Sequence, residues 1–187
     1  PYPSGTVSWH PKSAELWSVT PQTIKLASFE NRPSSLAINS GAAQFTGMLV
    51  DVGEGVSVSD YPFGSLDGHV VLATGPSARV YQLAVVERNA TGIVFGPSNV
   101  ELAPLWRVLP QKNLRQDEPH LGFSLSFESY ERVKEIFSVN RSSRSIGTTS
   151  EQDGLTRMLV RAHTAVETRP AETALIEATI PGEDVLD

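Results

Sequence analysis

The sequence contains no cysteine, which excludes disulfides, thiolate zinc sites and cysteine nucleophiles together. It also lacks any run of about 18 consecutive apolar residues, the length that a membrane-spanning helix requires. No basic segment is followed by an apolar stretch of the kind that marks a signal peptide. We therefore expect no membrane span, and we interpret the chain, which begins at Pro1, as an excised or processed piece.

Basic residues are fewer than acidic ones, with 15 Lys and Arg against 21 Asp and Glu, so the formal net charge is -6. Such a chain has no overall field to attract polyanions, and we expect no nucleic-acid partner. Apolar residues make up 40% and charged residues 19%, which is typical of a globular protein. A length of 187 residues suits one domain, which we place over residues 1–187.

Metal-ligand patterns are also missing. The four histidines are isolated from one another and none belongs to an H-E-x-x-H or H-x-D pattern: His10, His69, His120 and His163. A catalytic zinc site needs several ligands that converge on the metal and a carboxylate nearby. We therefore predict no metal site and no cofactor within this chain.

Serine and dinucleotide motifs fail similar tests. Residues 75–79 and 96–100 both begin Gly-Pro-Ser but lack the second glycine of the nucleophile elbow G-x-S-x-G. Residues 52–55 resemble the start of a dinucleotide fingerprint, but the third glycine is missing and no helix pattern follows. The sequence thus predicts no catalytic residue.

The first 40 residues differ in composition from the rest. Prolines separate short apolar runs at Val7–Trp9 and Leu16–Val19. Because proline removes a ladder donor and favours edges and turns, we expect a proline-rich clasp of short edge strands over residues 1–40. Trp9 and Trp17 would anchor this clasp on a main body formed by residues 41–187.

The centre of the chain reads as a strand, a helix and a strand. The apolar run His69–Ala73 predicts a buried strand, and Ile93–Phe95 predicts another. Between them, Ser77 is positioned to cap an amphipathic helix that ends near Asn89. We expect the two strands to be parallel, because a helix crossover joins them. An additional strand is predicted over residues 43–52.

Residues 98–119 contain three prolines and weak periodicity, so we expect a surface excursion. Leu121–Leu125 restores a strand pattern, and Ser126 opens a second amphipathic helix. One face of that helix carries Tyr130, Val133, Ile136 and Phe137. Residues 138–154 are polar and predict a loop.

Period-two alternation over residues 158–165 predicts a half-exposed strand, and a second such strand follows at Thr173–Ile180. We expect these two to form an antiparallel hairpin. With parallel strands in the centre and antiparallel strands here, the fold class is α/β, rich in β-structure, with mixed sheets.

Two central segments resemble the protease-associated (PA) domain. Residues 66–72, LDGHVVL, and residues 84–94, AVVERNATGIV, look like its "G-K-V-V-L" strand and the "G-A-x-G-I-I" end of its helix. The resemblance implies a swivelling β/β/α sandwich or open barrel with flanking helices. The sequence departs from the pattern at His69, where lysine is usual, and at Asn89, where glycine is usual. We expect Asn89 to take the left-handed conformation that glycine would adopt.

The wider chain resembles the PA insert of secreted bacterial di-zinc aminopeptidases. Residues 9–17 and 33–40 look like the region that leads into that insert. Residues 174–182, ALIEATIPG, are similar to the strand that precedes the first zinc-binding His-x-Asp of the family. The resemblance implies zinc in an adjacent peptidase domain, a secreted protein in an extracellular or periplasmic setting, and no catalytic residue in this chain.

Three hypotheses of function follow. The first is a non-catalytic accessory or lid domain of a secreted zinc aminopeptidase, which shapes access of a peptide or protein substrate or mediates protein interaction. Its interaction loop would include Leu102, Leu105, Trp106 and Arg107. The alternative is a free-standing PA domain of receptor type that binds a peptide or protein through residues 98–119. The third is an enzyme that uses the same architecture with an active site that no motif reveals.

Overall fold

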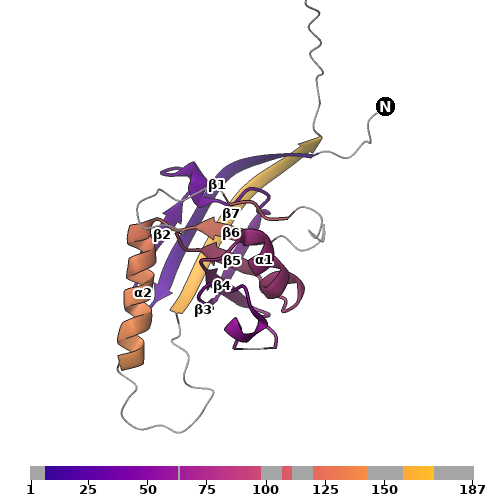
Figure 1. Ribbon diagram of the computed structural model, residues 1–187. Coiled ribbons are helices and arrows are strands. Elements are labelled where there is room, and N and C mark those ends of the chain that lie inside the picture. The colour runs from indigo at the N-terminus through magenta and orange to yellow at the C-terminus, as the bar shows by residue number, and fades with distance from the viewer. Residues whose placement is uncertain (1–6, 63, 98–106, 111–119, 143–157, 171–187) are drawn as a thin grey trace, which may run out of the picture.

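The computed structural model describes residues 7–62, 64–97, 107–110, 120–142 and 158–170, which form one mixed seven-stranded sheet with helices packed against it (Figure 1). The strands are β1 (Val7–Thr20), β2 (Ile24–Ser28), β3 (Ala43–Asp51), β4 (His69–Ala73), β5 (Gly92–Phe95), β6 (Leu121–Ser124) and β7 (Met158–Pro170). The helices are α1 (Ser77–Tyr81) and α2 (Phe127–Ser142), with single turns at η1 (Pro33–Ser35), η2 (Val58–Asp60) and η3 (Gln82–Val86).

The strand order is β2-β1-β7-β3-β4-β5-β6. Strands β3 to β6 are parallel to one another, whereas β7 is antiparallel to both β1 and β3, and β1 is antiparallel to β2. This arrangement confirms the β-rich α/β class with a mixed sheet. Among the described residues, no helix is both long enough and apolar enough to cross a membrane.

The central β4-α1-β5 unit confirms the predicted strand, helix and parallel strand. The register runs from Val70 opposite Gly92 to Ala73 opposite Phe95. Helix α1 continues directly into η3, a π-helical turn in which Glu87 donates its N–H to the Gln82 carbonyl at 3.1 Å. The helical segment therefore spans the distance between two neighbouring parallel strands.

Both faces of the parallel strands are buried. In β4, Val70 and Leu72 pack into a core that includes Val133 of α2, whereas Val71 and Ala73 pack into a second core with α1 and η3. Strands that are covered on both faces have continuous apolar runs, whereas strands covered on one face alternate. Strand β4 has a continuous apolar run from Val70 to Ala73. The residues of α1 and η3 in the second core are Val80, Tyr81, Leu83, Ala84 and Val85.

The two edge strands, β2 and β6, approach each other although five strands separate them in the sheet. Leu26 of β2 and Phe123 of β6 belong to the same buried cluster, together with Val133 of α2. Turn η1 contacts both edge strands, and Leu36, just after it, forms an antiparallel bridge with Phe123. The sheet therefore curls, and of the two forms that the PA resemblance implies, a sandwich or an open barrel, it approaches the open barrel.

The prediction of short edge strands over residues 1–40 is right for β2, which has five residues at one edge of the sheet, and wrong for β1. Strand β1 is a single 14-residue strand, and it pairs with β7 along its length and with β2 over Glu15–Ser18. Pro11 is tolerated inside it because the register against β7 shifts between Pro11 and Ser13, and such a bulge removes the need for a regular ladder. Trp9 anchors β1, since its indole N–H donates to the Ser40 carbonyl at 2.8 Å.

Three further expectations need correction. Ser77 is the first residue of α1 and not its cap, because Pro76 occupies the cap position without a side-chain hydrogen bond. Helix α2 continues to Ser142, beyond the Ser138 boundary predicted for the loop. Strand β7 is paired on both sides from Leu159 to Thr164, by β1 and β3, whereas a hairpin with residues 173–180 was predicted; those residues lie outside the described ranges.

Asn89 adopts the left-handed conformation, with φ of 65°. Its N–H donates to the Val85 carbonyl at 3.0 Å, and the next N–H, of Ala90, reaches back to the Ala84 carbonyl at 2.9 Å. These bonds close the helical segment before β5, as the sequence predicted for this position.

Replacement of Asn89 tests whether the positive φ at this position contributes to stability. Asn89→Ala should lower the free energy of unfolding by about 1 kcal/mol, because alanine pays the steric penalty of positive φ. Asn89→Gly should leave it unchanged or raise it. Urea unfolding followed by circular dichroism measures both, and equal stability of the two variants would contradict a left-handed residue here.

Candidate functional site

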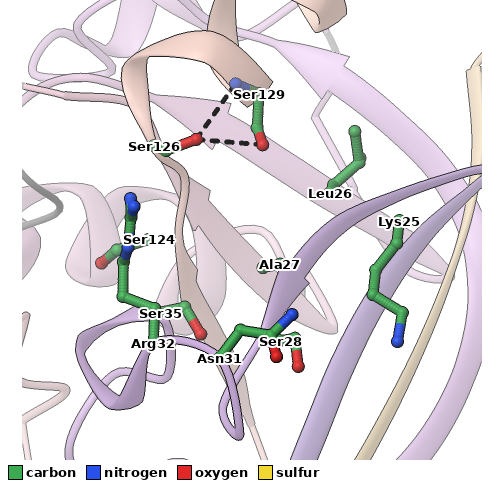
Figure 2. Close-up of a pocket in the computed structure, with 10 residues that line it drawn as sticks. All are labelled: Lys25, Leu26, Ala27, Ser28, Asn31, Arg32, Ser35, Ser124, Ser126 and Ser129. Atoms are coloured by element: carbon green, nitrogen blue, oxygen red, sulfur yellow. Dashed lines mark hydrogen bonds between the residues drawn. The ribbon is translucent and has the colours of Figure 1, made fainter.

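A polar pocket lies between the two edge strands at the start of α2 (Figure 2). Its volume is about 340 Å³, and its lining comprises Lys25, Leu26, Ala27, Ser28, Asn31, Arg32, Ser35, Ser124, Ser126 and Ser129. Among the described residues, the lining contains five serines and two cationic side chains but no carboxylate. These groups can donate hydrogen bonds and attract negative charge.

The position of the pocket follows from the order of the elements. Strand β6 ends at Ser124, and α2 begins at Phe127, so the pocket lies where a parallel strand passes into a helix. Ligands of open α/β sheets commonly bind outside the carboxyl ends of the strands. Residues 25–35 close the opposite side, because the curl of the sheet brings β2 and η1 to this edge.

Ser126 caps α2 at the pocket. Its hydroxyl oxygen accepts the Ser129 N–H at 3.1 Å, and its carbonyl accepts the Tyr130 N–H at 2.9 Å. The prediction that Ser126 opens the second helix is therefore confirmed. The first turn of a helix carries partial positive charge, so this end of α2 favours an anion.

Two serines of the pocket have buried hydroxyls. Ser35 and Ser124 each have 3% of their surface exposed, and neither hydroxyl finds a hydrogen-bond partner among the described residues. A buried polar group that lacks a partner costs about 1–3 kcal/mol, and most buried polar groups are satisfied. These hydroxyls come from η1 and from the end of β6, and both border the same cavity.

The two cations of the pocket have different environments. Lys25 pairs with Glu15 and lies 4.8 Å from the centroid of the Trp17 ring, so its charge is engaged by two side chains of β1 that do not line the pocket. The hydrogen bond from Lys25, then the one from Trp17, lowers the pKa of Glu15. Arg32 is exposed and extends toward the end of β6 in Figure 2, and within the described part of the chain no hydrogen bond or ion pair holds its guanidinium.

The interaction loop predicted from the sequence lies mostly outside the described residues, which include Arg107 but not Leu102, Leu105 or Trp106. The Arg107 guanidinium lies 5.2 Å from the centroid of the Phe95 ring, and its Nη1 is 3.5 Å from the Gly75 carbonyl. Burial lowers the pKa of Arg107. Arg107 is thus held at the carboxyl ends of β4 and β5, and it does not line the pocket.

The histidines stay apart in the fold. Within the described ranges, no three His, Asp or Glu side chains gather into a group that could hold a metal ion. Each histidine has its own neighbour: His10 bonds to Ser8, His69 to the Asp67 carbonyl and His163 to Gln44, and the His120 ring lies edge-on to Tyr81 with centroids 5.8 Å apart.

A second cluster joins Tyr61 and Arg88 on the α1 side of the sheet. The Tyr61 hydroxyl donates to the Gly55 carbonyl at 2.9 Å, and the Arg88 guanidinium lies 4.6 Å from the centroid of the Tyr61 ring. Arg88 also donates to the Leu83 carbonyl at 2.8 Å. Burial raises the pKa of Tyr61 to about 12. This cluster fastens the loop before β4 to η3, and we interpret it as structural.

Comparison with known proteins identifies the fold. No protein-family model and no curated protein matches the chain. Solved structures do match: a peptidase M28 precursor from Shewanella amazonensis SB2B aligns with TM-score 0.55 and 10% identity over 88% of this chain and 37% of its own. BSAP, a zinc aminopeptidase from Bacillus subtilis, aligns with TM-score 0.51 and 13% identity over 86% of this chain and 33% of its own.

An aminopeptidase from Aneurinibacillus sp. strain AM-1 gives a TM-score of 0.50 with 12% identity over 88% of this chain and 35% of its own. At such identities the likeness shows the fold alone. The chain therefore has the fold of one part of these peptidases and spans about a third of their length.

Loss of the α2 cap should be measurable. Ser126→Ala should lower the free energy of unfolding by about 1 kcal/mol, because the Ser129 N–H loses its acceptor. Ser126→Thr keeps a hydroxyl at this position and should retain most of the stability. Chemical denaturation monitored by circular dichroism measures both, and an alanine variant as stable as the parent would rule out this capping role.

The raised pKa of Tyr61 predicts a dependence of stability on alkaline pH. The unfolded chain ionises this phenol near pH 10 and the folded protein only near 12, so stability falls as the pH rises from about 10 to about 12. Tyr61→Phe should flatten that decline, measured by urea unfolding at several pH values. Tyr81 and Tyr130, whose pKa values burial also raises, remain in both proteins and cancel in the difference. Parallel stability profiles of variant and parent between pH 10 and 12 would refute this contribution of Tyr61.

Proposed function

We propose that this chain is a non-catalytic accessory domain, of the PA type, from a larger secreted zinc aminopeptidase. The asymmetry of the structural matches carries the proposal: 88% of this chain aligns with only 37% of the peptidase M28 precursor, and two aminopeptidases give similar proportions. A chain that aligns over most of its length with about a third of a larger protein is expected when the chain corresponds to one domain of that protein. We take residues 1–187 as one such domain.

The PA assignment draws support from the central unit. The two segments that resemble the PA pattern, residues 66–72 and 84–94, contain most of β4 and most of β5, and these strands are parallel and adjacent. Asn89, which stands where the pattern has glycine, adopts the positive φ that glycine accepts most readily. The backbone at this position is therefore the one that the glycine of the pattern would adopt, although the residue differs.

In this proposal, zinc and the catalytic groups belong to an adjacent peptidase domain, and this chain shapes the access of a peptide or protein substrate. The contacts would come from the segment that includes Leu102, Leu105, Trp106 and Arg107. The described end of this segment is held by the backbone of Ile38, whose N–H donates to the Arg107 carbonyl at 2.8 Å and whose carbonyl accepts the Leu109 N–H at 3.0 Å. The Leu109 side chain is fully buried. The segment thus departs from a fixed point near the carboxyl ends of β4 and β5. The host would act in an extracellular or periplasmic setting.

The experiment compares the native polypeptide with the 187-residue chain. Antibodies against the chain isolate the native protein, whose intact mass and hydrolysis of leucine p-nitroanilide are then measured with and without a chelator. We expect a much longer polypeptide with chelator-sensitive activity, and no activity from the 187-residue chain with or without added zinc. Hydrolysis by the short chain itself would overturn the accessory role.

The access role has its own test within the native enzyme. Replacement of residues 99–105 by a Gly-Ser linker of equal length should change KM for long peptides and leave kcat/KM for the small anilide unaltered. The matched control is a Gly-Ser replacement of residues 145–151, which also lie outside the described elements. An equal effect on both substrates would contradict a role in substrate access.

A further inference from the structure

We propose that the pocket between β2, β6 and α2 is a binding site for a small oxyanion, a phosphate, sulfate or carboxylate group. Arg32, the hydroxyls of Ser35 and Ser124 and the first N–H groups of α2 would hold it. The site does not depend on the proposed accessory role, because every group assigned to it belongs to this chain.

The end of a helix supplies the first part of the site. Helix α2 is 16 residues long, and its first turn borders the pocket. The N–H groups of Phe127 and Glu128, at the first two helical positions, have no carbonyl of a preceding turn to bind. Unpaired N–H groups and the helix dipole together favour a negative group at this position.

The buried hydroxyls are the second and independent observation. Ser35 and Ser124 are each 97% buried, come from separate elements and lack partners within the described chain. Each O–H can donate one hydrogen bond, and an oxyanion has enough lone pairs to accept both. A bound anion would satisfy two groups that otherwise remain buried at a cost.

The charges around the pocket favour an anionic ligand over a neutral hydrogen-bond acceptor. The Arg32 guanidinium is the cation of the pocket that no described group pairs, since Lys25 is engaged by Glu15. The nearest acidic residue of α2, Glu128, is exposed, pairs with Arg132 at 2.9 Å and does not line the pocket. The local field is therefore positive although the whole chain is acidic.

The size of the cavity adds one constraint on the ligand. A volume of about 340 Å³ lies at the lower end of the range for small-molecule pockets, so the anionic group can belong to a small molecule or to the end of a peptide. A free phosphate and a peptide carboxylate offer the same acceptor oxygens. In a peptide the rest of the molecule would also contact the pocket and add to the affinity, whereas a free phosphate has no such additional part.

The test titrates the 187-residue chain with inorganic phosphate at constant ionic strength, followed by amide chemical shifts and calorimetry. Saturable shifts should concentrate at Ser35, Ser124 and Phe127. Arg32→Gln should weaken binding by about tenfold or more, because it removes a charge-assisted contact. Arg161→Gln, which changes an exposed arginine of β7 outside this pocket, is the matched control and should bind as the parent does.

The double variant Ser35→Ala, Ser124→Ala separates binding from folding. It should weaken phosphate binding while the ligand-free protein stays as stable as the parent or becomes more stable, because two unsatisfied hydroxyls are removed. A loss of stability without ligand would show that these hydroxyls are already satisfied and would count against the proposal. So would unchanged phosphate affinity in Arg32→Gln.

Two further arms identify the source of the anion. Acetate and a short peptide with a free carboxyl terminus are compared with the same peptide carrying a terminal amide. Preference for phosphate or sulfate supports a tetrahedral oxyanion, and preference for the free peptide over the amide supports a chain terminus. Absence of saturable binding by phosphate, sulfate, acetate and the free peptide overturns the site.

Discussion

The parallel strands β3 to β6 must be covered on both faces, and the rest of the architecture follows from this requirement. Their residues point alternately to two cores, so one layer of helix cannot bury them. Helix α1 with η3 covers one face, and α2 covers the other with Val133 and Phe137. Because α2 must begin directly after β6 to reach its face, its first turn is fixed beside the end of that strand. The position of the pocket is thus a result of how the core is buried.

The curl of the sheet completes the pocket from residues that are distant in sequence. Ser40 holds the segment after η1 against β6: its hydroxyl donates to the Ala37 carbonyl at 2.7 Å and accepts the Gly122 N–H at 3.1 Å. Gly122 permits this approach, because a Cβ there would lie 2.7 Å from the Ala37 Cβ. With this segment fixed on β6, η1 presents Ser35 to the cavity. Burial of a polar hydroxyl is the local cost of bringing the sheet edges together.

The local patterns of the sequence predicted the centre of the fold, and the non-local pairings escaped them. The run His69–Ala73 and the turn at Asn89 are encoded within short windows, so the β4-α1-β5 unit was predicted correctly. The length of β1 was not predicted. Pro11 indicates the end of a strand, and the sequence does not reveal the bulge against β7 that accommodates this proline. The pocket was missed because its serines lie in two segments about ninety residues apart, and Ser126 alone gave a visible signal, as a cap. The role of residues 98–119 stays a prediction.

The long antiparallel pair of β1 and β7 has a mechanical consequence. Val7 lies opposite Pro170, so the first and the last described strand ends lie next to each other (Figure 1). The polypeptide enters and leaves the described body through this two-stranded ribbon. A body attached in this way can be carried in a surface loop of another polypeptide without forcing the flanking elements apart. Two hydrogen-bonded strands also resist twisting more than a single connection does. Motion at such a stem would therefore turn the whole curled sheet as one piece.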